Sequence, residues 1–379
     1  MNDRDDPPTQ PLFPWKAGRL GGDVAPVLGV ELGQEALHLV QLAGGDGMPR
    51  IRVAASVPWG SERDVALGSA RRLRALLDMA RDQVDLRGDA AVVCLPADHA
   101  RLMVATVRVS DGMSEEEAFR AQVLDRLEGG PDAWLVDRIP LTVPDPACVE
   151  RRMMLALVAR DEAEAYRACL ADAGLDVRAT ELGPVALRRL VSVLAGRPPY
   201  PSMVLVNIGR TRTFLTLVAG RRLVLDRPIA GGEDDVLRAL AVAMRMAVPA
   251  VRVILYRFGL VPRADLPQPS AAAGDLGAQL RLRARPALTG LVEDIRQLMT
   301  YAAAHPRAGP VQRVLLLGSA ARWPGGDSLL GELLGVPVEQ LDPLSLLDAL
   351  PGAAGHVDPA CPAALAVATG CALHHHSTL

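Results

Sequence analysis

The sequence predicts an α/β protein built from two related halves, with a smaller α+β block inserted into the first half. The first observation is a pattern of strand, glycine, strand, turn and strand that begins near residue 27 and again near residue 203. The second is a change of pattern over residues 89–175, where strands and helices follow another order. A repeat separated by roughly 175 residues is too long for a solenoid and fits two lobes facing a shared cleft.

Composition limits the classes of function. The 379 residues are 50% hydrophobic, which is enough to fill the cores of two or three domains. A net charge of −3, with four Trp, four Tyr and four Phe, argues against nucleic-acid binding. The most apolar stretch, residues 240–260, is interrupted by three arginines, so no membrane-spanning helix is predicted. The first residues lack the basic start and apolar core of a signal peptide, and the five cysteines form no C-x-x-C pair, so we expect a cytoplasmic protein with reduced thiols.

Lysine usage excludes several enzyme classes. Lys16 is the only lysine, and it lies in a Pro-rich leader. A P-loop, a pyridoxal Schiff base, a protein-kinase strand lysine and a Ser-x-x-Lys nucleophile each require a lysine within the fold. No H-E-x-x-H, G-x-S-x-G or G-x-G-x-x-G motif occurs either. His374 and the two histidines after it could bind a metal, but a solvated chain end is the expected interpretation.

The glycine turns of the two repeats are the candidate ligand-binding elements. In the first repeat, VLGVEL (27–32) precedes Gly33 and the strands 37–42 and 51–57; in the second, MVLVNI (203–208) precedes Gly209 and the strands 213–218 and 222–229. Backbone amides at a glycine turn can hold a phosphate, because glycine permits close approach. The alternative is that each glycine only makes a hairpin.

The remaining elements follow in order. Residues 1–22 are predicted to be a disordered leader, 23–88 the first part of lobe 1, 89–175 the inserted subdomain, 176–200 a return to lobe 1, and 201–379 lobe 2. Within the insertion we expect strands at 90–95, 102–109, 134–143 and 153–158, a helix from Ser114, whose capping box is Ser-Glu-Glu-Glu, and a helix over 161–173.

In the second half, Gly231-Gly232 and an acidic triplet start a helix, because negative charge suits a helix N-terminus. Residues 262–287 are predicted to be a loop and 288–304 a helix. A buried strand, 311–317, ends in Gly318-Ser319, which could contact a nucleoside or form a tight β–α turn only. A short helix is predicted at 328–334, a strand at 336–341, and helices from residue 343 and over 362–373.

These three glycine turns, with a block inserted after the first, resemble the actin-like ATPase superfamily, and specifically the type IV pilus assembly protein PilM family. VLGVELGQEALHLVQL is similar to that family's first phosphate motif, the segment 203–232 to its second, and VLLLGSAARWPGGDSLLGELLG to its adenosine motif. The resemblance implies an actin-like (ribonuclease H-like) duplicated two-lobe fold with a 1C-type subdomain, and the leader is similar to the MSHA pilus biogenesis (MshI) branch. It also implies a nucleotide site, with the following residues: Glu31, Gly33, Gln34, Asn207, Gly209, Thr211, Gly231, Gly232, Gly318 and Ser319.

Departures from the family pattern weaken the implied site. The Asp, hydroxyl and Lys positions of the first motif hold Glu31, Gln34, Glu35, Ala36 and His38, and the Asp of the second motif is Asn207. An acidic residue in a phosphate loop repels the ligand, and an amide offers magnesium no carboxylate. We therefore expect no catalytic residues and weak or absent ATP hydrolysis. Two alternatives stay open: ATP with Mg²⁺ is kept as a structural clamp, or no cofactor binds.

The resemblance implies a cytoplasmic scaffold of a type IV or MSHA-type pilus, or of a type II secretion-like platform. Such a scaffold associates with the inner membrane through the N-terminal cytoplasmic tail of a PilN-like bitopic protein, which the family binds between subdomains 1A and 1C. A homo-oligomer is also compatible with the family. The alternatives are an active actin-like ATPase or sugar kinase, and a filament former like FtsA, although the polybasic C-terminal helix of that family is missing.

Overall fold

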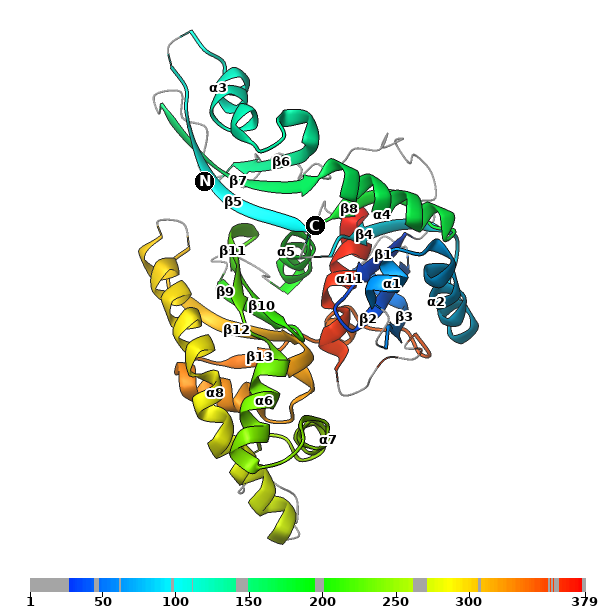
Figure 1. Cartoon of the computed structure of the whole chain (residues 1–379), viewed down its shortest axis with the longest axis vertical. Coiled ribbons are helices and arrows are strands. Elements are labelled where there is room, and N and C mark those ends of the chain that lie inside the picture. Colours follow the sequence, from blue (N-terminus) through cyan, green and yellow to red (C-terminus); the bar gives the residue numbers. More distant parts are fainter. Residues whose placement is uncertain are drawn as a thin grey trace. The chain divides into compact units, whose positions relative to one another are not determined.

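A computed structural model describes residues 27–43, 48–60, 63–96, 99–110, 112–140, 149–194, 201–261, 271–305, 308–353, 355, 357 and 361–376. The chain divides into two units (Figure 1). Unit 1 holds residues 1–186, 349–356 and 367–379, and unit 2 holds residues 187–348 and 357–366. The predicted disordered leader, residues 1–22, lies outside the described residues.

The five-stranded sheet of unit 1 has the order β3-β2-β1-β4-β8. Its strands are β1 (Leu28–Leu32), β2 (Ala36–Ala43), β3 (Arg50–Pro58), β4 (Ala90–Cys94) and β8 (Asp176–Glu181). The first three form an antiparallel meander, and β4 and β8 add to β1 in parallel. Helices α1 (Arg63–Leu67) and α2 (Ala70–Gln83) connect β3 to β4, and Leu73 and Leu77 of α2 are buried in the core.

Unit 2 repeats this sheet in the order β11-β10-β9-β12-β13. Its strands are β9 (Ser202–Ile208), β10 (Arg212–Ala219), β11 (Arg222–Ala230), β12 (Val311–Gly318) and β13 (Val338–Gln340). The pairing of β2 with β3 has a register shift after Gln41, and the pairing of β10 with β11 has one at the equivalent place, after Leu217. The two five-stranded sheets thus share their strand order, their strand directions and the position of a bulge, which confirms the predicted duplication.

The inserted subdomain is a three-stranded antiparallel sheet of order β5-β7-β6. It consists of β5 (Ala100–Arg108), β6 (Trp134–Pro140) and β7 (Glu150–Ala159), with α3 (Glu115–Gln122) packed on one face through Phe119 (Figure 1). The Ser114–Glu117 capping box starts α3 as predicted. Two short 3-10 helices, Leu124–Arg126 and Pro131–Ala133, lead from α3 to β6.

The predicted bounds of the insertion, 89–175, were too wide. Strand β4 pairs with both β1 and β8, so it is a central strand of the unit 1 sheet. Helix α4 (Arg160–Asp172) buries Leu170 in the same core as α2, and begins one residue before the predicted cap Asp161. The insertion proper therefore runs from residue 95 to residue 159. Strand β8, which was not predicted, closes the sheet after it.

The predicted second lobe, 201–379, was also wrong at its end, because the chain returns to unit 1. The segment around residue 350 bonds to β3: Leu350 N–H donates to the Ile51 carbonyl and Gly355 N–H to the Ala54 carbonyl, each at 2.8 Å. Helix α11 (Ala366–Ala372) packs so closely on β1 that a Cβ at Gly29 would lie 2.0 Å from the Ala368 carbonyl oxygen. Helix α5 (Gly183–Leu194) spans the boundary between the units.

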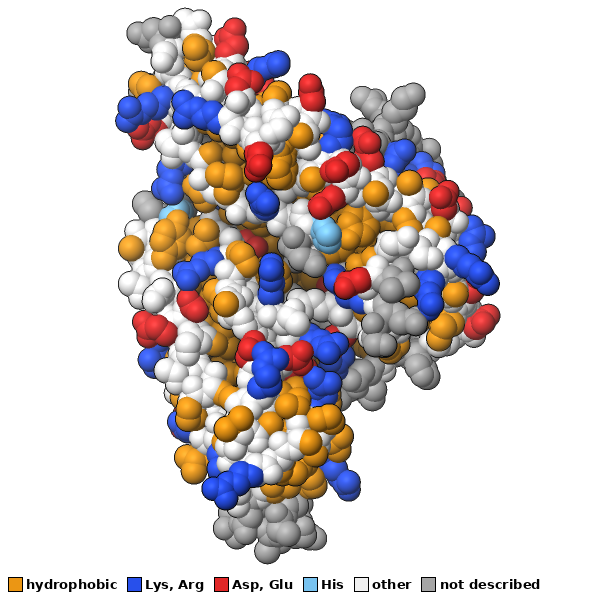
Figure 2. Space-filling view, in the orientation of Figure 1, with side chains coloured by type: hydrophobic (Ala, Val, Ile, Leu, Met, Phe, Trp, Pro, Cys, Tyr) orange, Lys and Arg blue, Asp and Glu red, His pale blue; other side chains and the backbone are white. Residues whose placement is uncertain are grey.

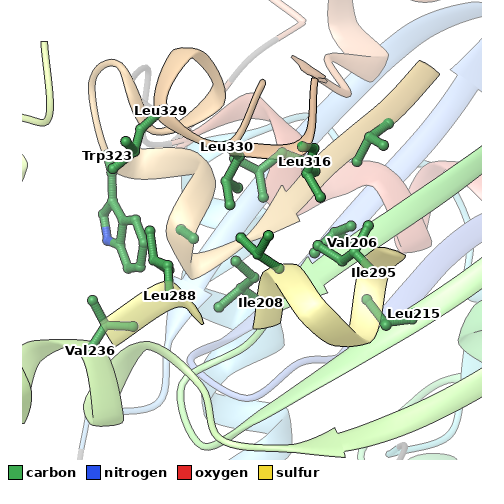
Figure 3. Packing of buried hydrophobic residues seen from close by; sticks show 14 of the residues in the cluster. Val206, Ile208, Leu215, Val236, Leu288, Ile295, Leu316, Trp323, Leu329 and Leu330 are labelled. Atoms are coloured by element: carbon green, nitrogen blue, oxygen red, sulfur yellow. The ribbon is translucent and has the colours of Figure 1, made fainter. Parts of the chain in front are cut away.

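Helices cover the sheet of unit 2 and complete its core. They are α6 (Glu233–Met244), α7 (Val248–Phe258), α8 (Ala271–Ala304) and α9 (Gly326–Leu334). Figure 3 shows Val206, Ile208 and Leu316 of the strands packed against Leu288 and Ile295 of α8. The short elements α10 (Pro343–Leu346), 362–365 and 373–376 are helical turns.

The predicted loop over 262–287 was partly wrong. Helix α8 begins at Ala271 and continues through Pro286 to Ala304. Its first half is anchored by Leu280 and Ala284, which are buried in the core of unit 2. Burial of an apolar face here outweighs the cost of a proline inside a helix. Residues 262–270 lie outside the described residues.

Within the described ranges, no single helix has the length and apolarity required to cross a membrane. One pair, α6 and α7, meets the criteria jointly by length and composition, but the two helices are bent by 101° relative to each other.

Candidate functional site

The carboxyl ends of β9 and β12 bring three predicted residues together in unit 2. The strands are parallel neighbours, with Asn207 paired to Leu317 and Ile208 to Gly318. A Cβ at Gly318 would lie 2.4 Å from Asn207 Oδ1, and its φ of +79° is one that glycine adopts without strain. Glycine is therefore required where the turn to Ser319 passes Asn207. Ligands of open α/β sheets bind at such carboxyl edges.

The turn after β9 contacts the start of α6. Glu233 N–H donates to the Gly209 carbonyl and Asp234 N–H to the Arg210 carbonyl, both at 2.9 Å. A Cβ at Gly232 would lie 2.5 Å from the same Gly209 oxygen. Seven of the ten predicted site residues thus share one region of unit 2: Asn207, Gly209, Thr211, Gly231, Gly232, Gly318 and Ser319.

Four backbone amides of this region already donate hydrogen bonds within the protein. Besides the two amides of α6, Gly209 N–H donates to the Arg212 carbonyl and Gly232 N–H to Asp235 Oδ2, each at 2.9 Å. The Gly232 hydrogen bond, followed by contacts with Arg238, lowers the pKa of Asp235. A phosphate bound to these four amides would first have to break their hydrogen bonds, each of which contributes about 1 kcal/mol to stability.

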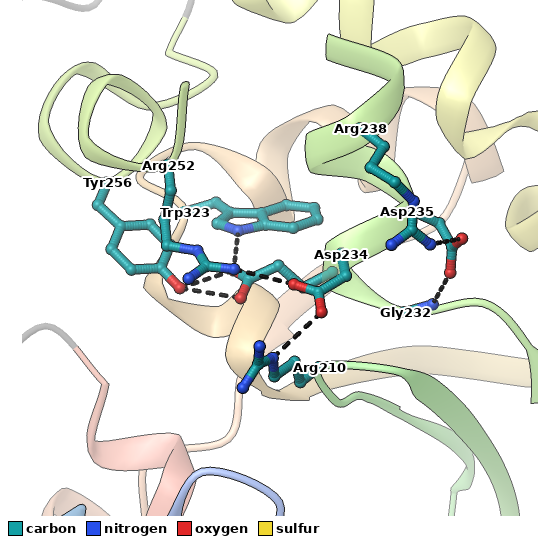
Figure 4. Close-up of polar contacts among 9 residues, drawn as sticks. Arg210, Gly232, Asp234, Asp235, Arg238, Arg252, Tyr256 and Trp323 are labelled. Carbon is teal, nitrogen blue, oxygen red and sulfur yellow. Dashed lines mark hydrogen bonds and ion pairs between the residues drawn. The ribbon is translucent and has the colours of Figure 1, made fainter. Parts of the chain in front are cut away.

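A charged network fills the space beside α6 (Figure 4). The fully buried Glu233 carboxylate accepts hydrogen bonds from Tyr256 Oη at 2.8 Å and Trp323 Nε1 at 2.9 Å. Asp234 accepts from Arg210 Nε at 3.1 Å and Arg252 Nη2 at 2.9 Å. The acidic triplet was predicted only to complement the helix dipole. Its partners were missed, because Tyr256 and Trp323 are remote in sequence from Glu233.

In unit 1, the predicted Glu31 lies at the carboxyl end of β1, between His38 on β2 and Cys94 on β4. Part of its side chain reaches the surface, but Oε2 is buried and has no hydrogen-bond partner among the described residues. Burial raises the pKa of Glu31 from 4.5 to about 8. At neutral pH the group is therefore a carboxylic acid, which is a poor magnesium ligand.

The other two predicted residues of unit 1, Gly33 and Gln34, lie in the β1–β2 turn. The Gly33 carbonyl accepts from Trp59 Nε1 at 2.9 Å and from Arg63 Nε at 3.0 Å, so the turn is fixed from the β3 side. His38, which stands where the family has lysine, is buried and its Nδ1 lies 2.8 Å from Ser56 Oγ. Its ring lies beside the turn, because a Cβ at Gly33 would be 3.2 Å from His38 Nε2.

A buried pair that was not predicted lies at the same edge of the unit 1 sheet. Register places Glu31, Cys94 and Glu181 side by side on β1, β4 and β8. The nearly fully buried Glu181 is hydrogen-bonded to His374 Nδ1, so the interpretation of His374 as a solvated end was wrong. Sequence reasoning would have found this pair if it had predicted β8, because that strand places the Glu181 carboxylate at the carboxyl edge of the sheet.

Among the described residues, no group of three or more His, Cys, Asp or Glu side chains is arranged to hold a metal ion. The site thus consists of two separate sets of turn residues. Glu31, Gly33 and Gln34 belong to unit 1, and the other seven belong to unit 2.

Comparison with known proteins identifies the fold. No protein-family model matches the chain, and no curated protein matches it in sequence. Among solved structures, a chain of a PilM-PilN type IV pilus biogenesis complex aligns with 92% of this chain and 97% of its own length, at 22% identity and a TM-score of 0.69. The ethanolamine utilization protein EutJ from Carboxydothermus hydrogenoformans aligns with 93% of this chain and 91% of its own, at 15% identity and a TM-score of 0.52. The duplicated sheets and these likenesses show that the chain has the actin-like fold.

Proposed function

We propose that this chain is a cytoplasmic actin-like scaffold of a type IV or MSHA-type pilus, or of a type II secretion-like inner-membrane platform. It binds the N-terminal cytoplasmic tail of a PilN-like bitopic membrane protein and thereby associates with the inner membrane. The observation that supports this most is the likeness to the PilM-PilN complex over 92% of the chain. The uncovered part of this chain is shorter than the insertion at residues 95–159. At least part of the inserted block is therefore included in the alignment.

The outer edge of β5, beside the face that meets the rest of unit 1, is the site that we propose for the tail. Ala100 and Leu102 pack on the cluster formed by Leu95, Ala156, Val158, Ala163 and Leu182. Val104 follows on the same face, because side chains alternate along a strand, and it is exposed. In the inserted sheet, β5 pairs only with β7 among the described strands, so it is an edge strand. An extended peptide can add to such an edge and place an apolar side chain beside Val104.

Weak or absent ATP hydrolysis is the second part of the proposal. Four amides of the unit 2 turns donate within the protein, Glu31 is neutral at pH 7, and Asn207 offers no carboxylate. Phosphoryl transfer depends on a positioned metal and on preorganised donors, so this arrangement favours docking over turnover. If ATP with Mg²⁺ binds, it acts as a structural clamp and not as a substrate.

Calorimetric titration with a synthetic tail peptide of a PilN-like protein tests the docking. We expect saturable binding by the wild-type chain and at least a tenfold loss for Val104→Glu, because a carboxylate would be buried in the interface. Val253→Glu in unit 2 is the matched control and should bind like wild type. Absence of binding at low salt, or equal binding by Val104→Glu, would contradict the proposal.

Phosphate release with magnesium and ATP separates the scaffold from an active ATPase. We expect no release above a buffer control. Rapid release that is lost in Asn207→Ala would instead support the active ATPase or sugar kinase. Titration with a non-hydrolysable ATP analogue decides independently whether a clamp remains.

A further inference from the structure

The bend between α6 and α7 presents large apolar side chains to solvent. We call residues 236–258 the α6–α7 elbow. Val242 is 80% exposed, Val253 is 65% exposed, and Met246 lies between them in the bend. Figure 2 shows hydrophobic side chains gathered over the lower part of unit 2, where α6 and α7 lie in Figure 1. Single exposed valines are ordinary, but a gathered set at a helix bend indicates a contact surface.

The charge of this stretch is unlike that of the whole chain. Residues 236–258 contain four arginines and no aspartate or glutamate, although the chain as a whole has a net charge of −3. Arg238 and Arg252 are ion-paired with acidic residues at the start of α6. Arg245 and Arg257 are exposed, and Arg283 of α8 donates to the Ala243 carbonyl at the end of α6. The apolar side chains of the elbow are therefore flanked by positive charge.

Burial of the opposite helix faces excludes a membrane-spanning role for this pair. Leu237 and Leu240 of α6, and Val251 and Leu255 of α7, have essentially no exposed surface and belong to the core of unit 2. Insertion across a bilayer would remove these side chains from that core. The 101° bend also prevents one continuous span. Contact with a surface uses only the exposed faces and leaves the core intact.

We propose that the α6–α7 elbow binds the surface of an anionic lipid bilayer. Apolar side chains beside arginines, without acidic residues, are the composition of segments that lie in the interface of anionic membranes. The valines and Met246 would enter the headgroup region, and the exposed Arg245 and Arg257 would contact lipid phosphates. Nucleic acid would leave the apolar side chains without a partner. This contact is additional to the one through the tail of a membrane partner, and it does not depend on that proposed function.

Co-sedimentation of the full chain with lipid vesicles tests the proposal. We expect the wild type to bind vesicles of phosphatidylcholine with phosphatidylglycerol, to bind phosphatidylcholine alone weakly, and to be released by salt. The charge reversal Arg245→Glu changes the local charge by two units and should weaken partitioning about 30-fold. The double variant Val242→Glu/Val253→Glu should lose vesicle binding.

Matched controls separate the elbow from other causes. Arg71→Glu on α2 and Val149→Glu before β7 alter exposed residues of the same types in unit 1 and should bind like wild type. Trp15→Ser/Lys16→Ser tests the leader. Circular dichroism and the melting temperature verify folding, and the tail-peptide titration should be unchanged in the elbow variants.

Three outcomes would overturn the proposal. They are no binding of the wild type to anionic vesicles at low salt, equal binding by the double elbow variant, and loss of binding only in the leader variant. Light scattering identifies a competing occupant: a lower oligomeric mass of the elbow variants, with vesicle binding unchanged, would assign the surface to a second copy of the chain.

Discussion

Replacement of Glu31 by glutamine should stabilise unit 1 at neutral pH. In the unfolded chain this carboxyl group ionises with its ordinary pKa of 4.5, whereas burial raises the pKa to about 8 in the folded protein. The unfolded state therefore releases this proton first as pH rises. The resulting loss of stability is absent below pH 4.5, grows between pH 4.5 and 8, and is constant above. Glutamine keeps the shape of the side chain and removes the titration.

The magnitude follows from the two pKa values. Each pH unit above 4.5 costs about 1.4 kcal/mol, so the limit at pH 7 is about 3 kcal/mol. Because part of the Glu31 side chain reaches water, a gain of about 1–3 kcal/mol is expected, or roughly 2–10 °C in melting temperature.

Thermal unfolding of wild type and Glu31→Gln from pH 4 to pH 8 measures this effect. The two curves should agree near pH 4.5 and diverge as pH rises, with the variant more stable. Glu128→Gln, which removes an exposed carboxylate of the same unit, is the control and should follow the wild type. Parallel curves for Glu31→Gln and wild type, or a less stable variant at pH 7, would refute the account of Glu31 as a neutral buried acid.

Three further predictions concern a buried hydrogen bond, helix propensity and the packing of α11. Trp323→Phe removes one of the donors to buried Glu233 and should destabilise unit 2 by about 1–2 kcal/mol in urea unfolding; an unchanged midpoint would contradict a role for this bond. Gly290→Ala, an exposed position within α8 where a Cβ meets no atom within 4 Å, should stabilise by about 1 kcal/mol through helix propensity. Gly29→Ala should instead destabilise unit 1 by about 1–3 kcal/mol, because its Cβ would overlap the Ala368 carbonyl; a wild-type melting temperature would show that α11 does not pack there.

Local sequence patterns correctly predicted the strands and helix starts whose signals lie within a few consecutive residues. The strands before Gly33 and Gly209 are short apolar runs bounded by glycine, and the Ser114–Glu117 capping box lies within four residues, so each can be recognised without tertiary information. The turns that lie together in unit 2 were named through the resemblance to the PilM family and not from local patterns alone.

The features that were missed depend on contacts between distant residues. Strand β8 alternates charged and apolar residues only weakly and becomes buried through its pairing with β4. The return of α11 to unit 1 requires Gly29, whose significance is invisible until the two segments meet. Glu233 is recognisable as a helix-start acid, but its contacts with Tyr256 and Trp323 follow from packing alone.

The position of α11 has a consequence for the order of folding during synthesis. Most of unit 2 is one continuous stretch, residues 187–348, whereas unit 1 needs the helix at Ala366–Ala372 from beyond it. The ribosome therefore completes nearly all of unit 2 before α11 can pack on β1, although α2 is already available for the core of the meander. Domains usually fold as their residues emerge. In this chain the half that is translated first should reach its native state last, and until then its apolar surface is exposed to chaperones.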